Sequence, residues 1–204
     1  MGLKAVRKML AIVIAAALVL TSTIGVFAAP SPTSGVVSGG SAEATKTTSI
    51  TVNLGSAVNA ETYNVYVNGE LKYKNVKGPF VTIEVSKNGN YTVEVAGVNK
   101  GGKEGEKTVV GKVSTKKKAA KVKAKRAGKK AVKVSWKKLK KVSAYKIAIY
   151  KDGELWKTVN ASKKKTSKTI KKLTKGAKYK FVVTPVYDND YIGIGKASKA
   201  VKAK

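Results

Sequence analysis

Apolar and polar residues alternate with a period of two through most of the chain from Ile50 onward. In SITVNL (49–54), Ile50, Val52 and Leu54 fall on one face and the polar residues fall on the other. This alternation is typical of a strand with one buried and one solvated face. Other segments of the first half with this pattern are TYNVYV (62–67), FVTIEV (80–85) and YTVEVAGV (91–98). Turn signals rich in Gly and Asn separate them, and the sequence offers no helical period, so we predict an antiparallel all-β unit.

The second half repeats the alternation with lysine in the polar positions. In AVKVSW (131–136), Val132, Val134 and Trp136 share one face and Lys133 lies on the other. Similar segments are KVKAK (121–125), YKIAI (145–149) and YKFVV (179–183). A shift of one residue would turn every lysine into the core, so the pattern specifies the strand register strongly. We therefore expect these lysines on the solvated faces of folded strands.

The two halves also resemble each other. TYNVYVNGEL (62–71) matches AYKIAIYKDGEL (144–155) with two extra residues, an insertion that preserves the face of the strand. NYTVEVAGVN (90–99) matches KYKFVVTPVY (178–187) without a gap, and Tyr91 falls on Tyr179. The sequence thus predicts an internal duplication and two tandem β domains, over residues 46–115 and 116–204.

The residues before these domains divide into a targeting segment and a linker. Residues 1–28 combine a basic head, an apolar run of 12 residues and a small-residue exit, the features of a secretory signal peptide that is cleaved before Ala29. The run is shorter than the roughly 20 residues of a membrane span, so we expect no stable span after cleavage; an uncleaved anchor is the alternative. Residues 29–45 are rich in Ser, Thr, Gly and Pro, which predicts a flexible linker.

The net charge of +31 is concentrated in the second predicted domain. Residues 29–115 hold nine lysines against seven glutamates, whereas residues 116–204 hold 29 lysines and one arginine against four carboxylates. Cys and His are absent from the chain, which excludes nucleophiles, general bases and zinc sites built on them. A secreted chain without cysteine fits a bacterial, Gram-positive type of surface protein better than a small eukaryotic secreted module.

With AVKVSW (131–136), YKIAIY (145–150), LTKGAKY (173–179) and GIGKASKAV (193–201), the second repeat resembles the fibronectin type III domain family over about 85 residues. The resemblance rests on Trp136 at the end of AVKVSW, on YKIAIY (145–150) and on LTKGAKY (173–179), where Leu173, Gly176 and Tyr179 have the family spacing, although Lys175 replaces the usual proline. GIGKASKAV (193–201) is similar to the return into the last strand. The first repeat is a poorer match, with Leu54 where the family has Trp. The resemblance implies two tandem immunoglobulin-like, fibronectin type III-like β-sandwiches, and the family fold has seven strands in two sheets. The first repeat is shorter and degenerate, so we leave open whether it has the full set or lacks an edge strand.

The lysine-rich surface is the main candidate site. A charge of this size attracts polyanions, and we name as possible polyanion-binding residues the outward lysines of the predicted strands. These are Lys121, Lys123, Lys125, Lys133, Lys146 and Lys180. For an exported protein the expected partners are anionic cell-wall polymers or acidic glycans, and the alternative is charge that serves only solubility. Nucleic acid fits less well, because base recognition favours arginine and the mature chain has only Arg126.

Aromatic residues provide the second candidate, since they can stack on sugars. Tyr150 and Trp156 form a possible glycan platform, although strand-edge aromatics more often cover the margin of a core. The DND motif at 188–190 has too few carboxylates for a calcium site and suits a turn. We therefore expect no catalytic, cofactor-binding or metal residues and no cofactor. The predicted function is a secreted or wall-associated, monomeric, non-catalytic adhesion or spacer protein. The alternative is a glycan-binding accessory module of an extracellular polysaccharide-degrading system.

Overall fold

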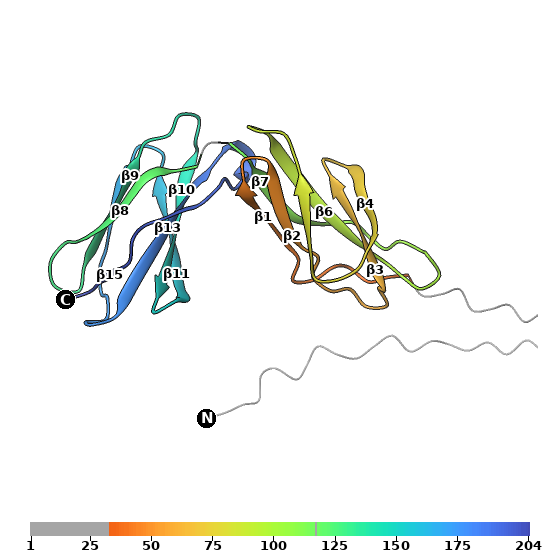
Figure 1. The fold of residues 1–204 in the computed structure, drawn as a ribbon, viewed down its shortest axis with the longest axis horizontal. Helices are drawn as coiled ribbons and strands as arrows, with labels where there is room; N and C mark the ends of the chain where they lie inside the picture. The colour runs from red at the N-terminus through yellow and green to blue at the C-terminus, as the bar shows by residue number, and fades with distance from the viewer. Residues whose placement is uncertain (1–32, 117) are drawn as a thin grey trace, which may run out of the picture. The chain divides into compact units, whose positions relative to one another are not determined.

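The computed structural model describes residues 33–116 and 118–204, and in this part of the chain the regular structure consists of β-strands and one short 3-10 turn. The predicted signal peptide lies outside the described residues. Two β-sandwiches follow each other along the chain, as expected (Figure 1). The first sandwich contains β1 to β7, and the second contains β8 to β15.

The first sandwich pairs a three-stranded sheet with a four-stranded sheet. The three-stranded sheet has the order β1-β2-β5, and the other has the order β4-β3-β6-β7. The strands are β1 (Ser41–Lys46), β2 (Ser49–Asn53), β3 (Thr62–Val67), β4 (Glu70–Val76), β5 (Phe80–Glu84), β6 (Asn90–Val98) and β7 (Thr108–Ser114). Ile50 and Val52 from one sheet pack with Val65 and Val93 from the other, and all four are fully buried. The first repeat therefore has seven strands.

The second sandwich has the same order of strands. The β8 sheet, as we call it, is ordered β12-β9-β8, and the β13 sheet is ordered β11-β10-β13, after which β14 and β15 both pair with β13. The strands are β8 (Ala120–Arg126), β9 (Val132–Lys137), β10 (Ala144–Lys151), β11 (Glu154–Ser162), β12 (Ser167–Ile170), β13 (Lys178–Val186), β14 (Lys196–Ala197) and β15 (Val201–Lys202). The last strand of the first sandwich corresponds to two short pieces here. The two sandwiches thus share one strand order, as the predicted duplication requires.

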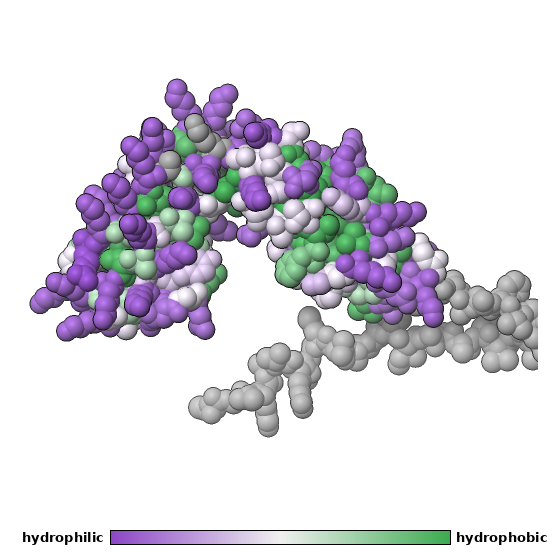
Figure 2. All heavy atoms as spheres, in the orientation of Figure 1, coloured by the Kyte–Doolittle hydropathy of each residue, from purple (hydrophilic) through white to green (hydrophobic). Residues whose placement is uncertain are grey.

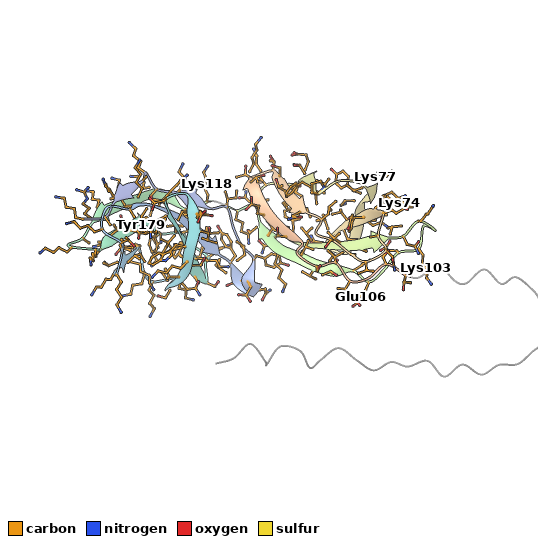
Figure 3. The ribbon with its side chains drawn as sticks, turned by 90° about the horizontal axis from the view of Figure 1, so that it is seen from below. Lys74, Lys77, Lys103, Glu106, Lys118 and Tyr179 are labelled. Atoms are coloured by element: carbon orange, nitrogen blue, oxygen red, sulfur yellow. The ribbon has the colours of Figure 1, made fainter. Side chains whose placement is uncertain are left out.

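The alternation with a period of two predicts correctly which strand residues of the second sandwich are buried in its core. Val132, Val134 and Trp136 face the core, whereas Lys133 is exposed. The inward residues of the β13 sheet are fully buried: Tyr145, Ile147, Ile149, Tyr179, Phe181 and Val183. Figure 3 shows Tyr179 inside this sandwich, with long side chains projecting outward around it. The lysines of the strands therefore lie on solvated faces, as the alternation predicts.

The segment expected to be a flexible linker differs from that expectation. β1 pairs with β2 from Ser41 to Lys46, and Val37 is only 5% exposed in the first core. Upstream of β1, Gly35 donates a backbone hydrogen bond to Val58 (2.8 Å). Residues 34–45 are thus an ordered part of the first sandwich. Its Ser- and Gly-rich sequence, VVSGGSAEATK, hides this strand because it lacks apolar alternation.

A polar network covers the outer face of the first sandwich. The hydroxyl of Tyr66 and the side-chain amide of Asn64 each donate a hydrogen bond to the carboxylate of Glu104. Burial, followed by the hydrogen bond to Glu104, raises the pKa of Tyr66. Glu104 belongs to the β6–β7 connection, which bonds back to β6 through Gly105 N–H and Gly97 C=O (2.9 Å). This connection shields Asn64 and Tyr66, which strand parity alone would place in solvent.

The β4 and β5 strands are sheet edges in the first sandwich. Because Val85 donates to Thr48, the alternation along β5 directs the Thr82 carbonyl away from β2. The hydroxyl of Tyr73, on β4, donates a hydrogen bond to this carbonyl (3.3 Å). Exposed lysines, Lys72 and Lys74, flank Tyr73 on the same edge strand. The outward Thr82 carbonyl of β5 is therefore occupied by the Tyr73 hydroxyl, and β4 carries the positive charges of Lys72 and Lys74.

Candidate polyanion-binding site

The described lysines of the second sandwich form no ion pair with a carboxylate. Within residues 33–116 and 118–204, the one ion pair joins Lys72 to Glu70 (2.8 Å), and it belongs to the first sandwich. The hydrogen bond from Lys72 lowers the pKa of Glu70. Figure 2 shows hydrophilic side chains over the visible surface of the second sandwich. Its positive charge is therefore balanced by solvent ions rather than by its own acidic groups.

One set of predicted lysines lies on the outer face of the β8 sheet. Lys125 on β8 pairs directly with Lys133 on β9, and Lys123 pairs with Ser135. Like charges opposite each other in a sheet repel, so this arrangement costs stability. Lys121 has a left-handed backbone (φ 53°) at an irregularity in the β8–β9 pairing. It lines a depression of about 620 Å³ together with Lys123, Lys125 and Lys199.

The other two predicted lysines lie on the β13 sheet. Lys146 pairs with Thr184, and Lys180 pairs with Tyr150, on the outer face of that sheet. The β8 and β13 sheets form opposite layers of the sandwich, so the structure divides the six predicted lysines between two faces. They do not make one patch.

Tyr150 and Trp156 also lie on different faces. Tyr150 is half-buried on the outer face of the β13 sheet, where it pairs with Leu155 and Lys180. The pairing of β10 with β11 shifts register between Ile149 and Tyr150, opposite Trp156. The Trp156 ring instead packs edge-on against the buried Tyr179 (5.9 Å between centroids), and the Lys157 ammonium lies 4.1 Å from the centroid of the indole. The two aromatics therefore do not form a shared platform, and Trp156 covers the core margin.

The structure brings Tyr150 and Lys180 into a groove that the sequence does not reveal. This basic groove, of about 770 Å³, runs along β13, and among the residues that line it are Tyr150, Asp152, Lys178, Lys180, Val182 and Lys202. Lys178 on β13 pairs directly with Lys202 on β15. The alternation of inward and outward residues along β13, followed two residues back from Lys180, predicts that Lys178 also lies on the outer face. Lys202 was missed because the last strand is split into β14 and β15, and no apolar pattern marks such a break.

Asp152 is the acidic residue of the basic groove. Its Oδ1 accepts a hydrogen bond from the backbone N–H of Lys178 (2.9 Å), and its own N–H donates to the Lys178 carbonyl (2.9 Å). Asp152 and Gly153 both have positive φ (50° and 106°), as the hairpin turn between β10 and β11 requires. This turn thus fixes the backbone of Lys178 and leaves its side chain on the outer face.

The described residues contain no group of three or more Asp, Glu, His or Cys side chains placed to hold a metal ion. Asp188 and Asp190 lie in the 3-10 turn η1 (Asp188–Asp190), where both are exposed. Among residues 33–116 and 118–204, no helix has the length and apolar character needed to span a membrane. The lining of the basic groove itself offers positive charge and the half-buried ring of Tyr150.

Comparison with known protein families gives a match over the second sandwich. Residues 118–203 match the fibronectin type III domain family. The resemblance drawn from Trp136, Leu173, Gly176 and Tyr179 is thereby confirmed. Fibronectin type III domains are generally non-catalytic scaffold modules, and they are typically extracellular. No curated protein matches the chain.

Solved structures of fibronectin type III domains are similar to the chain at low sequence identity. The FN1–FN3 domains of chicken CNTN1 share 14% identity (TM-score 0.40), and the match covers 84% of this chain and 66% of that chain. A segment of two fibronectin type III domains from chicken tenascin also shares 14% identity (TM-score 0.40), over 84% of this chain and all of that chain.

Proposed function

We propose that the protein is a secreted or wall-associated, non-catalytic adhesion or spacer protein whose second sandwich binds anionic surface polymers. The observation that carries the proposal is the uncompensated charge of the second sandwich. Its 30 basic residues face four acidic ones, and no ion pair is present among its described residues. Such a surface concentrates polyanions through long-range attraction that weakens as salt is added.

The distribution of the lysines supports an extended polymer as the partner. Lys125 and Lys133 lie on one face, and Lys178, Lys180 and Lys202 lie on the other. A flexible polyanion can follow both faces of one domain, whereas a small anion would neutralise only a few of these charges. The first sandwich, which is nearly neutral, suits the role of a spacer.

The test is a binding measurement on the mature chain, starting at Ala29, with teichoic acid, heparin and double-stranded DNA at low and moderate salt. We expect binding to teichoic acid and heparin that weakens steeply as salt rises. The test variant is a chain in which four lysines are replaced by Glu: Lys125, Lys133, Lys178 and Lys180. This charge-reversed chain should bind each polyanion much more weakly than wild type. If the wild-type chain ignored all three polymers at low salt, the proposal would be overturned.

A second candidate function is a glycan-binding accessory module, and the groove position of Tyr150 favours it. Binding through aromatic stacking alone should persist at high salt and should fail in Tyr150→Ala. Polyanion binding through charge alone should survive both Tyr150→Ala and Trp156→Ala and should fade with salt. A glycan array that compares these variants at two salt concentrations separates the two functions.

A further inference from the structure

The basic groove combines the two chemistries that the sequence suggests separately, namely an aromatic ring and clustered positive charge. Tyr150 and Lys180 are direct cross-strand partners on β10 and β13, and the groove also contains Lys178 and Lys202. Side chains of directly opposed residues begin only about 5 Å apart. A ligand that covers the Tyr150 ring therefore lies within reach of the Lys180 ammonium.

We propose that the basic groove binds an acidic sugar ring, a hexuronate unit of an acidic polysaccharide, which stacks on Tyr150 and places its carboxylate among Lys178, Lys180 and Lys202. This inference rests on the proposed polyanion binding and assigns it a specific site. A pyranose ring offers an apolar C–H face to an aromatic ring, and a uronate carries its charge at the edge of the same ring. The two features match the pair formed by Tyr150 and Lys180.

The paired lysines at the end of the groove strengthen the choice of an anion. Lys178 and Lys202 stand directly opposite each other on β13 and β15, and like charges in that position destabilise a sheet. Neither of them has an ion-pair partner among the described residues. A bound carboxylate would offset this repulsion, so binding should stabilise the second sandwich.

The groove favours a sugar over a nucleic acid. Single-stranded nucleic acids are bound by several aromatic rings that stack successive bases. The outward positions of β10 and β13 provide one aromatic ring, Tyr150, and their other members are Ala144, Lys146, Ala148, Lys178, Lys180, Val182, Thr184 and Val186. Arg126 is not among the residues that line the groove, and its Nε donates to the Lys202 backbone carbonyl (2.9 Å).

Asp152 supplies a sharp test, because it is the acidic group in the same groove. Its carboxylate opposes an incoming anion, while its Oδ1 fixes the Lys178 backbone. Asparagine retains an Oδ1 acceptor and tolerates the left-handed turn at this position. Asp152→Asn should therefore leave the fold intact and increase the affinity for a uronate oligomer by about threefold, a change of under one kcal/mol.

The experiment measures binding of the mature chain to an oligogalacturonate by calorimetry, with polyphosphate of equal charge, oligothymidylate and a neutral maltooligosaccharide as comparison probes. Tyr150→Ala should weaken oligogalacturonate binding about tenfold and leave polyphosphate binding unchanged, and Tyr150→Phe should bind nearly as well as wild type. The double variant Lys178→Ala, Lys180→Ala should lose more affinity than its matched control, Lys125→Ala, Lys133→Ala. Both double variants remove the same charge, from opposite faces.

The outcomes separate this inference from the proposed function. If the two double variants lost equal affinity, or if Tyr150→Ala weakened polyphosphate and oligogalacturonate equally, the groove would have no special role, although polyanion binding would stand. If oligothymidylate binding depended on Tyr150 more than oligogalacturonate binding did, the ligand class would be wrong. If wild type bound no polyanion at low salt, the proposed function itself would fail. Tryptophan fluorescence confirms that each variant is folded.

Discussion

The hydroxyl of Tyr179 accepts a hydrogen bond from the backbone N–H of Thr174, five residues earlier (3.0 Å). Its counterpart in the first sandwich, Tyr91, also bonds to the residue five positions earlier, donating to the Ser86 carbonyl (2.8 Å). A second pair of tyrosines repeats the relationship at a spacing of six. Tyr145 and Tyr63 accept from the backbone N–H groups of Leu139 (2.8 Å) and Ala57 (3.2 Å), respectively. The two sandwiches therefore share the spacing of their tyrosine–backbone hydrogen bonds as well as their topology, although Tyr91 donates where Tyr179 accepts.

The first prediction concerns Tyr179. Tyr179→Phe keeps the buried ring but leaves the Thr174 N–H without its acceptor, so we expect the second sandwich to lose about 1 kcal/mol of unfolding free energy. Both tryptophans of the chain, Trp136 and Trp156, belong to this sandwich, so tryptophan fluorescence during urea unfolding measures it selectively. Tyr91→Phe is the matched control, and it should leave the fluorescence transition unchanged.

Trp136 provides the second prediction. It is 4% exposed, it packs against Tyr145 (5.2 Å between ring centroids), and its Nε1 has no hydrogen-bond partner among the described residues. Trp136→Ala should destabilise the second sandwich by about 3–5 kcal/mol, because it opens a cavity in the core. Trp136→Phe should cost clearly less, since no hydrogen bond is lost. Trp156 remains as the fluorescent reporter; equal losses in the two variants would contradict this account.

The third prediction is that salt stabilises the second sandwich. Screening relieves repulsion among its lysines, so the urea midpoint followed by tryptophan fluorescence should rise between low and moderate salt. Lys133→Glu converts the Lys125–Lys133 pair from repulsive to attractive, and it should stabilise this sandwich by roughly 0.5 kcal/mol at low salt. The gain should shrink as salt is added. A midpoint that does not change with salt would count against self-repulsion as a cost.

The fourth prediction concerns alkaline pH. Burial and, second to it, the proximity of Tyr145 raise the pKa of Tyr187 to about 12. Between pH 10 and 12 the unfolded chain releases this proton before the folded chain does, so the Tyr187 contribution to stability falls as pH rises. Lysines titrate in the same range, and Tyr187→Phe is therefore the reference. The stability of wild type relative to Tyr187→Phe should decline across this window; a constant difference would refute the assignment.

The fifth prediction concerns the ordered segment before Lys46. A chain that starts at Lys46 lacks β1 and the buried side chains of Val37 and Ala44, whereas a chain that starts at Thr33 keeps them. The shorter chain should lose hydrogen-exchange protection in β2 and β7, while the second sandwich keeps its fluorescence transition. If both chains showed the same protection, residues 33–45 would be the dispensable linker that their composition suggests.

The sequence predicts most where burial alternates residue by residue. Val132, Val134 and Trp136 lie inward and Lys133 outward, because a strand with one wet face admits only that register. It predicts less where tertiary pairing orders a polar segment. β1 has two partly or fully buried alanines and no apolar alternation, so its pairing with β2 is not visible in the sequence.

The candidate site shows the same contrast between residues placed by local alternation and residues placed by tertiary pairing. Parity places Tyr150 and Lys180 on the outer face, and they are cross-strand partners there. The register shift opposite Trp156 turns that ring toward Tyr179, which local parity does not reveal. The pairing of Lys178 with Lys202 depends on where the last strand breaks. Contacts between residues distant in sequence are set by pairing and not by local pattern, which is why the groove emerges only in three dimensions.

The hydrogen bond from Tyr73 to Thr82 has a consequence for molecules crowded on a surface. Neighbouring copies displayed at high density meet edge to edge, and an unpaired strand edge invites a strand from the next molecule. In the first sandwich, the Tyr73 hydroxyl occupies the outward carbonyl of Thr82, and Lys72 and Lys74 repel a second edge of the same kind. This edge of the first sandwich is therefore protected against strand exchange between neighbouring copies, even where the molecules are crowded together.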